Sequence, residues 1–197
     1  MSIRIIALLI AAIASLPAAD ASVPIIVSGG AGRRAEGNLC NKAENQPKMG
    51  DVSGAKRSVD AAVHADPKFW PALYIRAKIF LRQGQYQLAI ADCNEALQQY
   101  SGFVEASLLR AAINAHLGKY AEALKEVNYV ISLHPQRVTL GRALKQRAWL
   151  QATCPDPTFR NGQQEIRDAK AACSIAEWKD ENTIDTLACR IRRNRRF

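Results

Sequence analysis

Two consecutive stretches of the chain repeat one another with a period of 34 residues. FWPALYIRAKIFLRQGQYQLAIADCNEALQQYSG (residues 69–102) aligns without a gap with FVEASLLRAAINAHLGKYAEALKEVNYVISLHPQ (residues 103–136). Nine aligned positions are identical: Phe69/Phe103, Ala72/Ala106, Arg76/Arg110, Ala77/Ala111, Ile79/Ile113, Gly84/Gly118, Tyr86/Tyr120, Ala89/Ala123 and Asn94/Asn128. A fixed period of this length predicts an array of small, similar units.

The repeated positions predict a helical hairpin in each unit. Ala77, Ala89 and Ala96 are small residues placed where two antiparallel helices must approach closely. Gly84 falls in the turn between the helices, where a positive φ is needed and glycine adopts it without strain. Tyr86 adds bulk to the buried face. We therefore expect two antiparallel helices per unit.

This pattern resembles the tetratricopeptide repeat (TPR), a helix-turn-helix unit of about 34 residues. The family's typical positions fall on Ala77, Gly84, Tyr86, Ala89 and Ala96, with Ser101 where proline is usual, and then on Ala111, Gly118, Tyr120, Ala123, Val130 and Pro135. The resemblance implies an all-α fold, an α-solenoid of antiparallel helix-turn-helix repeats.

Weaker units flank the two clear repeats. Residues 36–68 read as a degenerate TPR-like capping repeat, because Pro47 would interrupt its first helix; its second helix is expected at about residues 51–65. The motifs ATCPDP, AC, WKD and DTLA (Ala152–Pro157 onward) are similar to a bacterial TPR variant. This resemblance implies that residues 137–178 form a variant TPR with a lengthened loop, and that residues 179–197 form the first helix of a truncated repeat plus an Arg-rich tail.

The N-terminus predicts export. Residues 1–21 read as a signal peptide, with Arg4 before an apolar run and Ala19-Asp20-Ala21 at the cleavage site. The run at residues 5–16 is shorter than the ~20 residues of a membrane-spanning helix. Residues 22–35 read as a flexible linker. We expect a periplasmic or cell-envelope protein with no membrane span in the mature chain; secretion and an uncleaved N-terminal anchor are the alternatives.

The charge of the chain depends strongly on its tail. The 197 residues contain 27 Lys plus Arg and 18 Asp plus Glu, a net charge of +9, and are 48% hydrophobic. Five arginines lie in residues 189–197, and without them the net charge falls to +4. The tail favours nucleic-acid or acidic-surface binding as an alternative function. A one-base frameshift in a longer repeat array is the competing explanation, so no nucleic-acid partner is expected.

The sequence offers little for catalysis. Its three histidines and five cysteines show no metal-ligand spacing, so we expect neither an enzyme nor a cofactor or metal site. Cys154 and Cys173 would lie roughly 16 Å apart along the helix axis, too far for a disulfide. Cys93 is expected to be a small core residue, and a bond between Cys173 and Cys189 stays open.

Binding is the function that the repeat predicts. An open stack of hairpins leaves a concave groove lined by one face of each first helix. The resemblance places eight residues there: Tyr74, Lys78, Arg82, Leu108, Ala112, His116, Lys145 and Trp149. Their mixture of cations and apolar groups favours an extended protein or peptide ligand with acidic and apolar side chains.

Other interpretations of the groove and of the whole chain stay open. The eight positions are also compatible with ordinary solvated helix residues. The pattern that clamps a terminal carboxylate in some family members is absent, because Ala112 and Ala115 stand where asparagine is useful. The chain also reads as a fragment of a larger TPR protein, and we expect self-association at its C-terminal end, where apolar surface is left uncovered.

Overall fold

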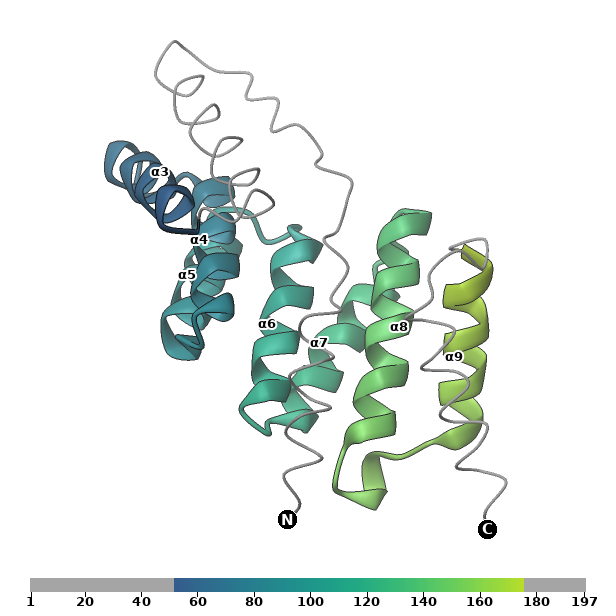
Figure 1. Ribbon diagram of the computed structural model, residues 1–197. Coiled ribbons are helices and arrows are strands. Elements are labelled where there is room, and N and C mark those ends of the chain that lie inside the picture. Colours follow the sequence, from purple (N-terminus) through teal and green to yellow (C-terminus); the bar gives the residue numbers. More distant parts are fainter. Residues whose placement is uncertain (1–51, 176–197) are drawn as a thin grey trace.

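The computed structural model describes residues 52–175, which form seven α-helices and one short 3-10 helix (Figure 1). No β-strand occurs in these residues. The elements are α3 (Val52–Ala65), α4 (Trp70–Arg82), α5 (Tyr86–Gln99), α6 (Val104–His116), α7 (Tyr120–Ser132), α8 (Arg137–Thr153), η2 (Pro157–Phe159) and α9 (Gly162–Ile175). The fold is an all-α helical repeat solenoid, as the sequence predicts.

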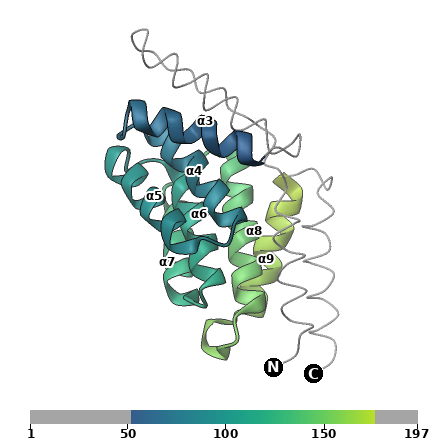
Figure 2. The same cartoon turned by 60° about the vertical axis from the view of Figure 1, so that its left-hand side comes forward.

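The helices form three consecutive hairpins, α4/α5, α6/α7 and α8/α9, and α3 packs on α4 (Figure 2). The first helices also touch one another, α4 against α6 and α6 against α8, while α5, α7 and α9 approach one another less. The more closely spaced helices lie on the inner side of a curved stack. The first helices α4, α6 and α8 therefore form the inner layer, and Figure 1 shows α6 and α8 in front of α7.

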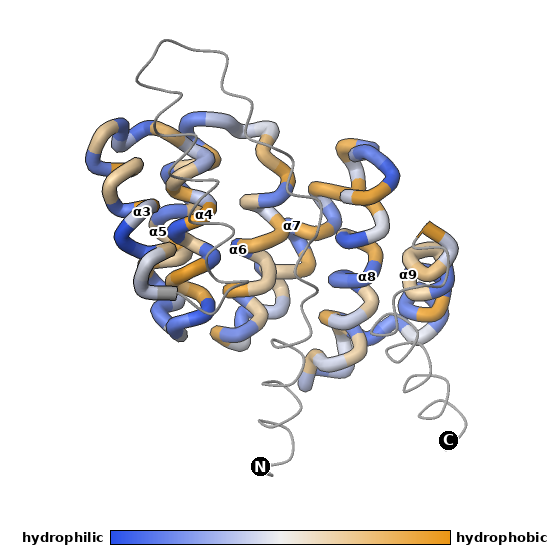
Figure 3. The backbone as a smooth tube through the Cα atoms, turned by 45° about the horizontal axis from the view of Figure 1, so that its top comes forward, coloured by the Kyte–Doolittle hydropathy of each residue, from blue (hydrophilic) through white to orange (hydrophobic). Residues whose placement is uncertain are grey.

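The repeated alanines lie at the helix contacts, as predicted. Ala77, Ala89, Ala96, Ala111 and Ala123 are all 0% exposed. A larger side chain at these positions would force the helices apart, because protein interiors are close-packed. Hydrophobic and hydrophilic residues alternate along each helix in Figure 3, which is typical of helices that bury one face.

The turns inside the first two hairpins depend on glycine. Gly84 and Gly118 have φ angles of 71° and 76°, a conformation that other residues adopt only with strain. The prediction for both positions is confirmed. His134, just beyond α7, is the non-glycine residue with a positive φ in the described part of the chain, at 48°.

The loop of the third hairpin is longer and held by its own polar contacts. The Asp156 carboxylate accepts hydrogen bonds from the backbone N–H and hydroxyl of Thr158, at 2.9 and 2.7 Å, and these bonds lower the pKa of Asp156. Arg160 donates to the carbonyl oxygens of Cys154 and Pro155. Phe159 packs against the core formed by α6, α7 and α8. These hydrogen bonds and the packing of Phe159 thus hold the loop against the neighbouring helices.

Several predicted segments lie outside the described residues. These are the signal peptide, the linker, the first helix of the unit at 36–68 and residues 176–197. The second helix of that unit is present as α3, which ends at Ala65 as expected. None of the described helices is long and apolar enough to cross a membrane.

Candidate functional site

The predicted binding residues lie along α4, α6 and α8, one helical turn apart on each helix. Tyr74, Lys78 and Arg82 follow one another at intervals of four residues, which places their side chains on one face of α4. We call the exposed side of the α4, α6 and α8 layer the inner face. Arg82 is exposed and Leu108 is buried. The other six predicted residues are half-buried and keep some surface exposed: Tyr74, Lys78, Ala112, His116, Lys145 and Trp149.

Tyr74 and Lys78 are in direct contact. The Lys78 ammonium nitrogen lies 5.5 Å from the centre of the Tyr74 ring, within range of a cation–π interaction. The Tyr74 ring in turn meets Phe103 edge-on, with ring centres 4.9 Å apart. These contacts place a positive charge directly beside apolar surface, which suits a ligand that carries both an acidic and an apolar group.

His116 contributes less charge to the inner face than its residue type indicates. Its imidazole stacks on the Tyr86 ring with centres 5.6 Å apart and planes 13° from parallel. Burial lowers the pKa of His116 below its usual value of 6.5, so the ring is neutral at pH 7. The positive charge of the inner face therefore comes from lysine and arginine.

Leu108 belongs to the core more than to the inner face. It is 8% exposed and packs with Val127 and Leu150, so little of its side chain can meet a ligand. Trp149 lies half-buried against the same core and keeps some of its ring accessible. The Gln146 side chain donates to the Leu108 carbonyl oxygen at 3.0 Å and links α8 to α6. Nothing in the repeat pattern points to Gln146.

A set of three arginines behind the inner face fixes how the hairpins pack. In each hairpin the first-helix arginine bonds to a carboxylate on its own second helix. The pairs and their shortest distances are Arg76–Asp92 at 2.7 Å, Arg110–Glu126 at 3.0 Å and Arg147–Asp168 at 2.6 Å. We call this set the arginine ladder.

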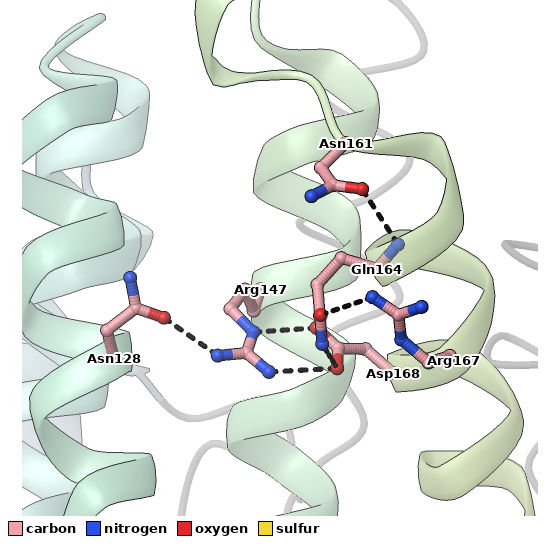
Figure 4. Close-up of polar contacts among 6 residues, drawn as sticks. All are labelled: Asn128, Arg147, Asn161, Gln164, Arg167 and Asp168. Atoms are coloured by element: carbon pink, nitrogen blue, oxygen red, sulfur yellow. Dashed lines mark hydrogen bonds and ion pairs between the residues drawn. The ribbon is translucent and has the colours of Figure 1, made fainter.

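Each arginine of the ladder also reaches the second helix of the preceding unit. Arg110 donates to Asn94 at 2.6 Å and Arg147 donates to Asn128 at 2.9 Å (Figure 4). Arg76 lies 3.9 Å from Asp60 in α3. One side chain thus ties together three helices, which sets the angle between neighbouring units and hence the spacing of the inner face.

Two of the three ladder arginines, Arg76 and Arg110, lie at identical positions of the repeat, but the sequence pattern did not predict their role. Arg76 and Arg110 appear in the repeat alignment, yet their carboxylate partners differ in type. The 34-residue period was the signal that could have revealed the partners of these arginines, because Asp60, Asn94 and Asn128 are polar residues spaced by one repeat length.

The buried thiols are core groups. Cys93 is 0% exposed, and burial raises the pKa of its thiol to about 12, so the reactive thiolate is suppressed. Cys154 and Cys173 are also buried and are not bonded to each other, as expected. In residues 52–175 no group of three His, Cys, Asp or Glu side chains is placed to hold a metal ion.

The fold and its inner face define a helical repeat protein. Two models of the family described as "Tetratricopeptide repeat" match residues 41–103 and residues 80–148, which together span more than half of the chain. The chain belongs to the tetratricopeptide repeat family.

Two curated relatives align with less than half of the chain. The chain is 35% identical over 78 residues to the tetratricopeptide repeat and J domain-containing co-chaperone DNJ1 of Cryptococcus neoformans var. grubii, and 31% identical over 86 residues to human DnaJ homolog subfamily C member 3. The aligned segments cover 40% and 44% of this chain but 15% and 17% of those relatives. The chain thus spans less than a fifth of either relative.

Solved structures share the fold at low identity. MamA from Desulfovibrio magneticus RS-1 superposes with a TM-score of 0.57 at 13% identity, covering 82% of this chain and 96% of that one. YrrB, described as a TPR protein with an unusual peptide-binding site, has a TM-score of 0.53 at 11% identity, covering 80% and 76%. Both likenesses support the helical repeat architecture.

Proposed function

We propose that this protein is an exported, non-catalytic scaffold that binds a protein or peptide along its inner face. The observation that carries the proposal is the contact of Lys78 with Tyr74, which puts a cation and an aromatic ring on the same exposed helix face. The peptide-binding site named for YrrB and the co-chaperone relatives support the same kind of partner.

The chemistry of the inner face favours an acidic ligand with apolar side chains. Lys78 and Arg82 on α4 and Lys145 on α8 supply positive charge. Tyr74 and Trp149 supply aromatic surface beside it. An extended segment of a partner protein can place alternate side chains on such a surface while its backbone stays solvated. This proposal needs no side chain to act as a nucleophile or general base.

Binding can be tested with a random peptide display library presented to the full-length chain. We expect enrichment of peptides that carry Asp or Glu together with large apolar residues. Reversing two inner-face charges with Lys78→Glu and Arg82→Glu should weaken an enriched peptide at least about tenfold, roughly 1.4 kcal/mol of binding free energy. Fluorescence anisotropy of the labelled peptide gives the affinity.

The matched control for this test reverses the same number of charges elsewhere. Lys119 and Lys125 are exposed lysines next to and within α7, outside the inner layer. The variant Lys119→Glu/Lys125→Glu should leave the affinity within about twofold. Equal losses in both double variants would show only long-range attraction and would contradict an inner-face site.

Export is tested separately through the N-terminus of the mature protein. The positive residue, the apolar run and the Ala19-Asp20-Ala21 sequence support cleavage after Ala21. In a bacterial host, we expect N-terminal sequencing of the protein from the periplasmic fraction to begin at Ser22. Recovery of the protein in the cytoplasm with Met1 or Ser2 at its N-terminus would contradict export.

A further inference from the structure

Four aromatic side chains meet at one end of the inner face, where α4 begins and where α5 passes into α6. The Trp70 ring lies 4.5 Å from Phe103 and 5.3 Å from Tyr100, measured between ring centres. Phe103 also meets Tyr74 at 4.9 Å. The rings thus run without interruption from Tyr100, at the edge, to Tyr74 on the inner face. We call these four residues the aromatic corner.

The aromatic corner is held in place while part of it stays exposed. Tyr100 is 49% exposed, and Trp70, Tyr74 and Phe103 are half-buried. The Tyr100 ring lies close over the turn, since a Cβ added at Gly102 would meet it at 3.3 Å. Rings that are already fixed lose little conformational freedom when a ligand binds, and tyrosine and tryptophan dominate binding energy at many interfaces.

The next unit does not repeat the aromatic corner. The positions 34 residues further on are Val104, Leu108, His134 and Arg137, none of which is aromatic apart from the imidazole of His134. Among the described first helices, the corner therefore lies at the α4 end of the inner face. This asymmetry gives the inner face a direction, because the cluster of four rings lies at its α4 end, whereas α8 contributes the single ring of Trp149.

Positive charge follows the aromatic corner along α4. Lys78 lies one turn beyond Tyr74, and Arg82 lies one turn beyond Lys78. Eight residues of helix separate Tyr74 from Arg82, a distance of about 12 Å along the axis. An extended peptide covers about 3.3 Å per residue, so about four of its residues span that distance.

We propose that the aromatic corner anchors one large apolar side chain of the ligand, and that Lys78 and Arg82 bind a carboxylate about four residues away. This inference rests on the proposed peptide-binding function and names the sequence class of its partner. The ligand is an extended segment of a partner protein, with a Trp, Phe or Leu anchor and an acidic residue at that spacing. Two observations carry the assignment. Lys78 and Arg82 complement the charge of an acidic residue, and the four rings lie at the α4 end of the inner face.

The spacing can be tested with synthetic peptides and the full-length chain. The peptides carry one Trp and one Asp-Glu pair in a Gly-Ser background, separated by one, four or eight positions, in both chain directions. We expect the spacing of four to bind at least tenfold more tightly than the other two spacings in at least one direction, by fluorescence anisotropy. Equal affinities at all three spacings would overturn the proposal.

Variants of Tyr100 test the aromatic corner itself. Tyr100→Ser should weaken the spacing-four peptide at least fivefold, whereas Tyr100→Phe, which keeps the ring, should retain its affinity. Tyr129→Ser is the matched control, because Tyr129 is 53% exposed on α7 and lies outside the inner layer. Circular dichroism shows whether each variant is folded. An equal loss of peptide affinity in Tyr129→Ser would contradict the proposal that the aromatic corner binds the ligand.

The outcomes separate this inference from the proposed function. If no peptide binds and the display library yields no enriched sequence, the proposed function fails. If peptides bind and lose affinity in Lys78→Glu/Arg82→Glu, but neither spacing nor Tyr100→Ser matters, the inner face binds peptide and only the aromatic anchor is wrong.

Discussion

Replacing Arg147 with alanine is expected to lower the free energy of unfolding by about 3–5 kcal/mol. The Asp168 side chain is 3% exposed and accepts two hydrogen bonds from the Arg147 guanidinium, at 2.6 and 2.9 Å. Without the guanidinium the carboxylate keeps the Gln164 amide at 2.7 Å, but its buried charge has lost its counterion (Figure 4). Urea-induced unfolding followed by circular dichroism measures the loss.

Two further variants distinguish the ion pair from the rest of the contact. Asn128→Ala removes only the exposed bond to Arg147 and should cost about 0.5–1.5 kcal/mol. The double variant Arg147→Met/Asp168→Leu should recover most of the stability, because an apolar pair of similar size often replaces a buried ion pair without loss. A loss below about 1 kcal/mol in Arg147→Ala would show that Asp168 is solvated in the native state.

Ile113→Ala is expected to lower the free energy of unfolding by about 2–5 kcal/mol. Ile113 is 0% exposed and packs from α6 into a cluster with Ala77, Leu81 and Cys93 of the preceding hairpin. Its truncation leaves a cavity between two repeat units. Because units of a solenoid are stabilised by their neighbours, we also expect the unfolding transition to broaden as α3–α5 and α6–α9 uncouple.

Two further variants serve as comparisons for the loss of stability in Ile113→Ala. Ile113→Val removes one methylene and should cost about 0.5–1.5 kcal/mol. Leu88→Ala truncates a large apolar side chain that is 50% exposed on α5, and its effect should stay within about 0.5 kcal/mol. If Leu88→Ala were as damaging as Ile113→Ala, stability would not follow the burial between units.

The unit of the fold could be predicted because its signals are local. Gly84 and Gly118 mark turns that need a positive φ, and the alanines of each unit mark close helix contacts. Both signals depend on residues within one hairpin, and the 34-residue period repeats them. The same reasoning predicted the helix now seen as α3 and the longer loop before α9.

The candidate site could be predicted only in outline. Helical periodicity places Tyr74, Lys78 and Arg82 on one face of α4 whatever the neighbouring helices do. It does not say which face a neighbour covers, and for this reason Leu108 turned out to be mostly buried and His116 to stack on Tyr86.

The sequence by itself determined the repeat, the hairpin turns and the family, because these follow from contacts between residues close in the chain. Only the tertiary structure decided the arginine ladder, the aromatic corner and the exposure of each inner-face residue. Those features join side chains from different units, and the angle at which the units pack sets their distances. That angle results from many long-range contacts together, none of which is visible in the pattern of any single repeat.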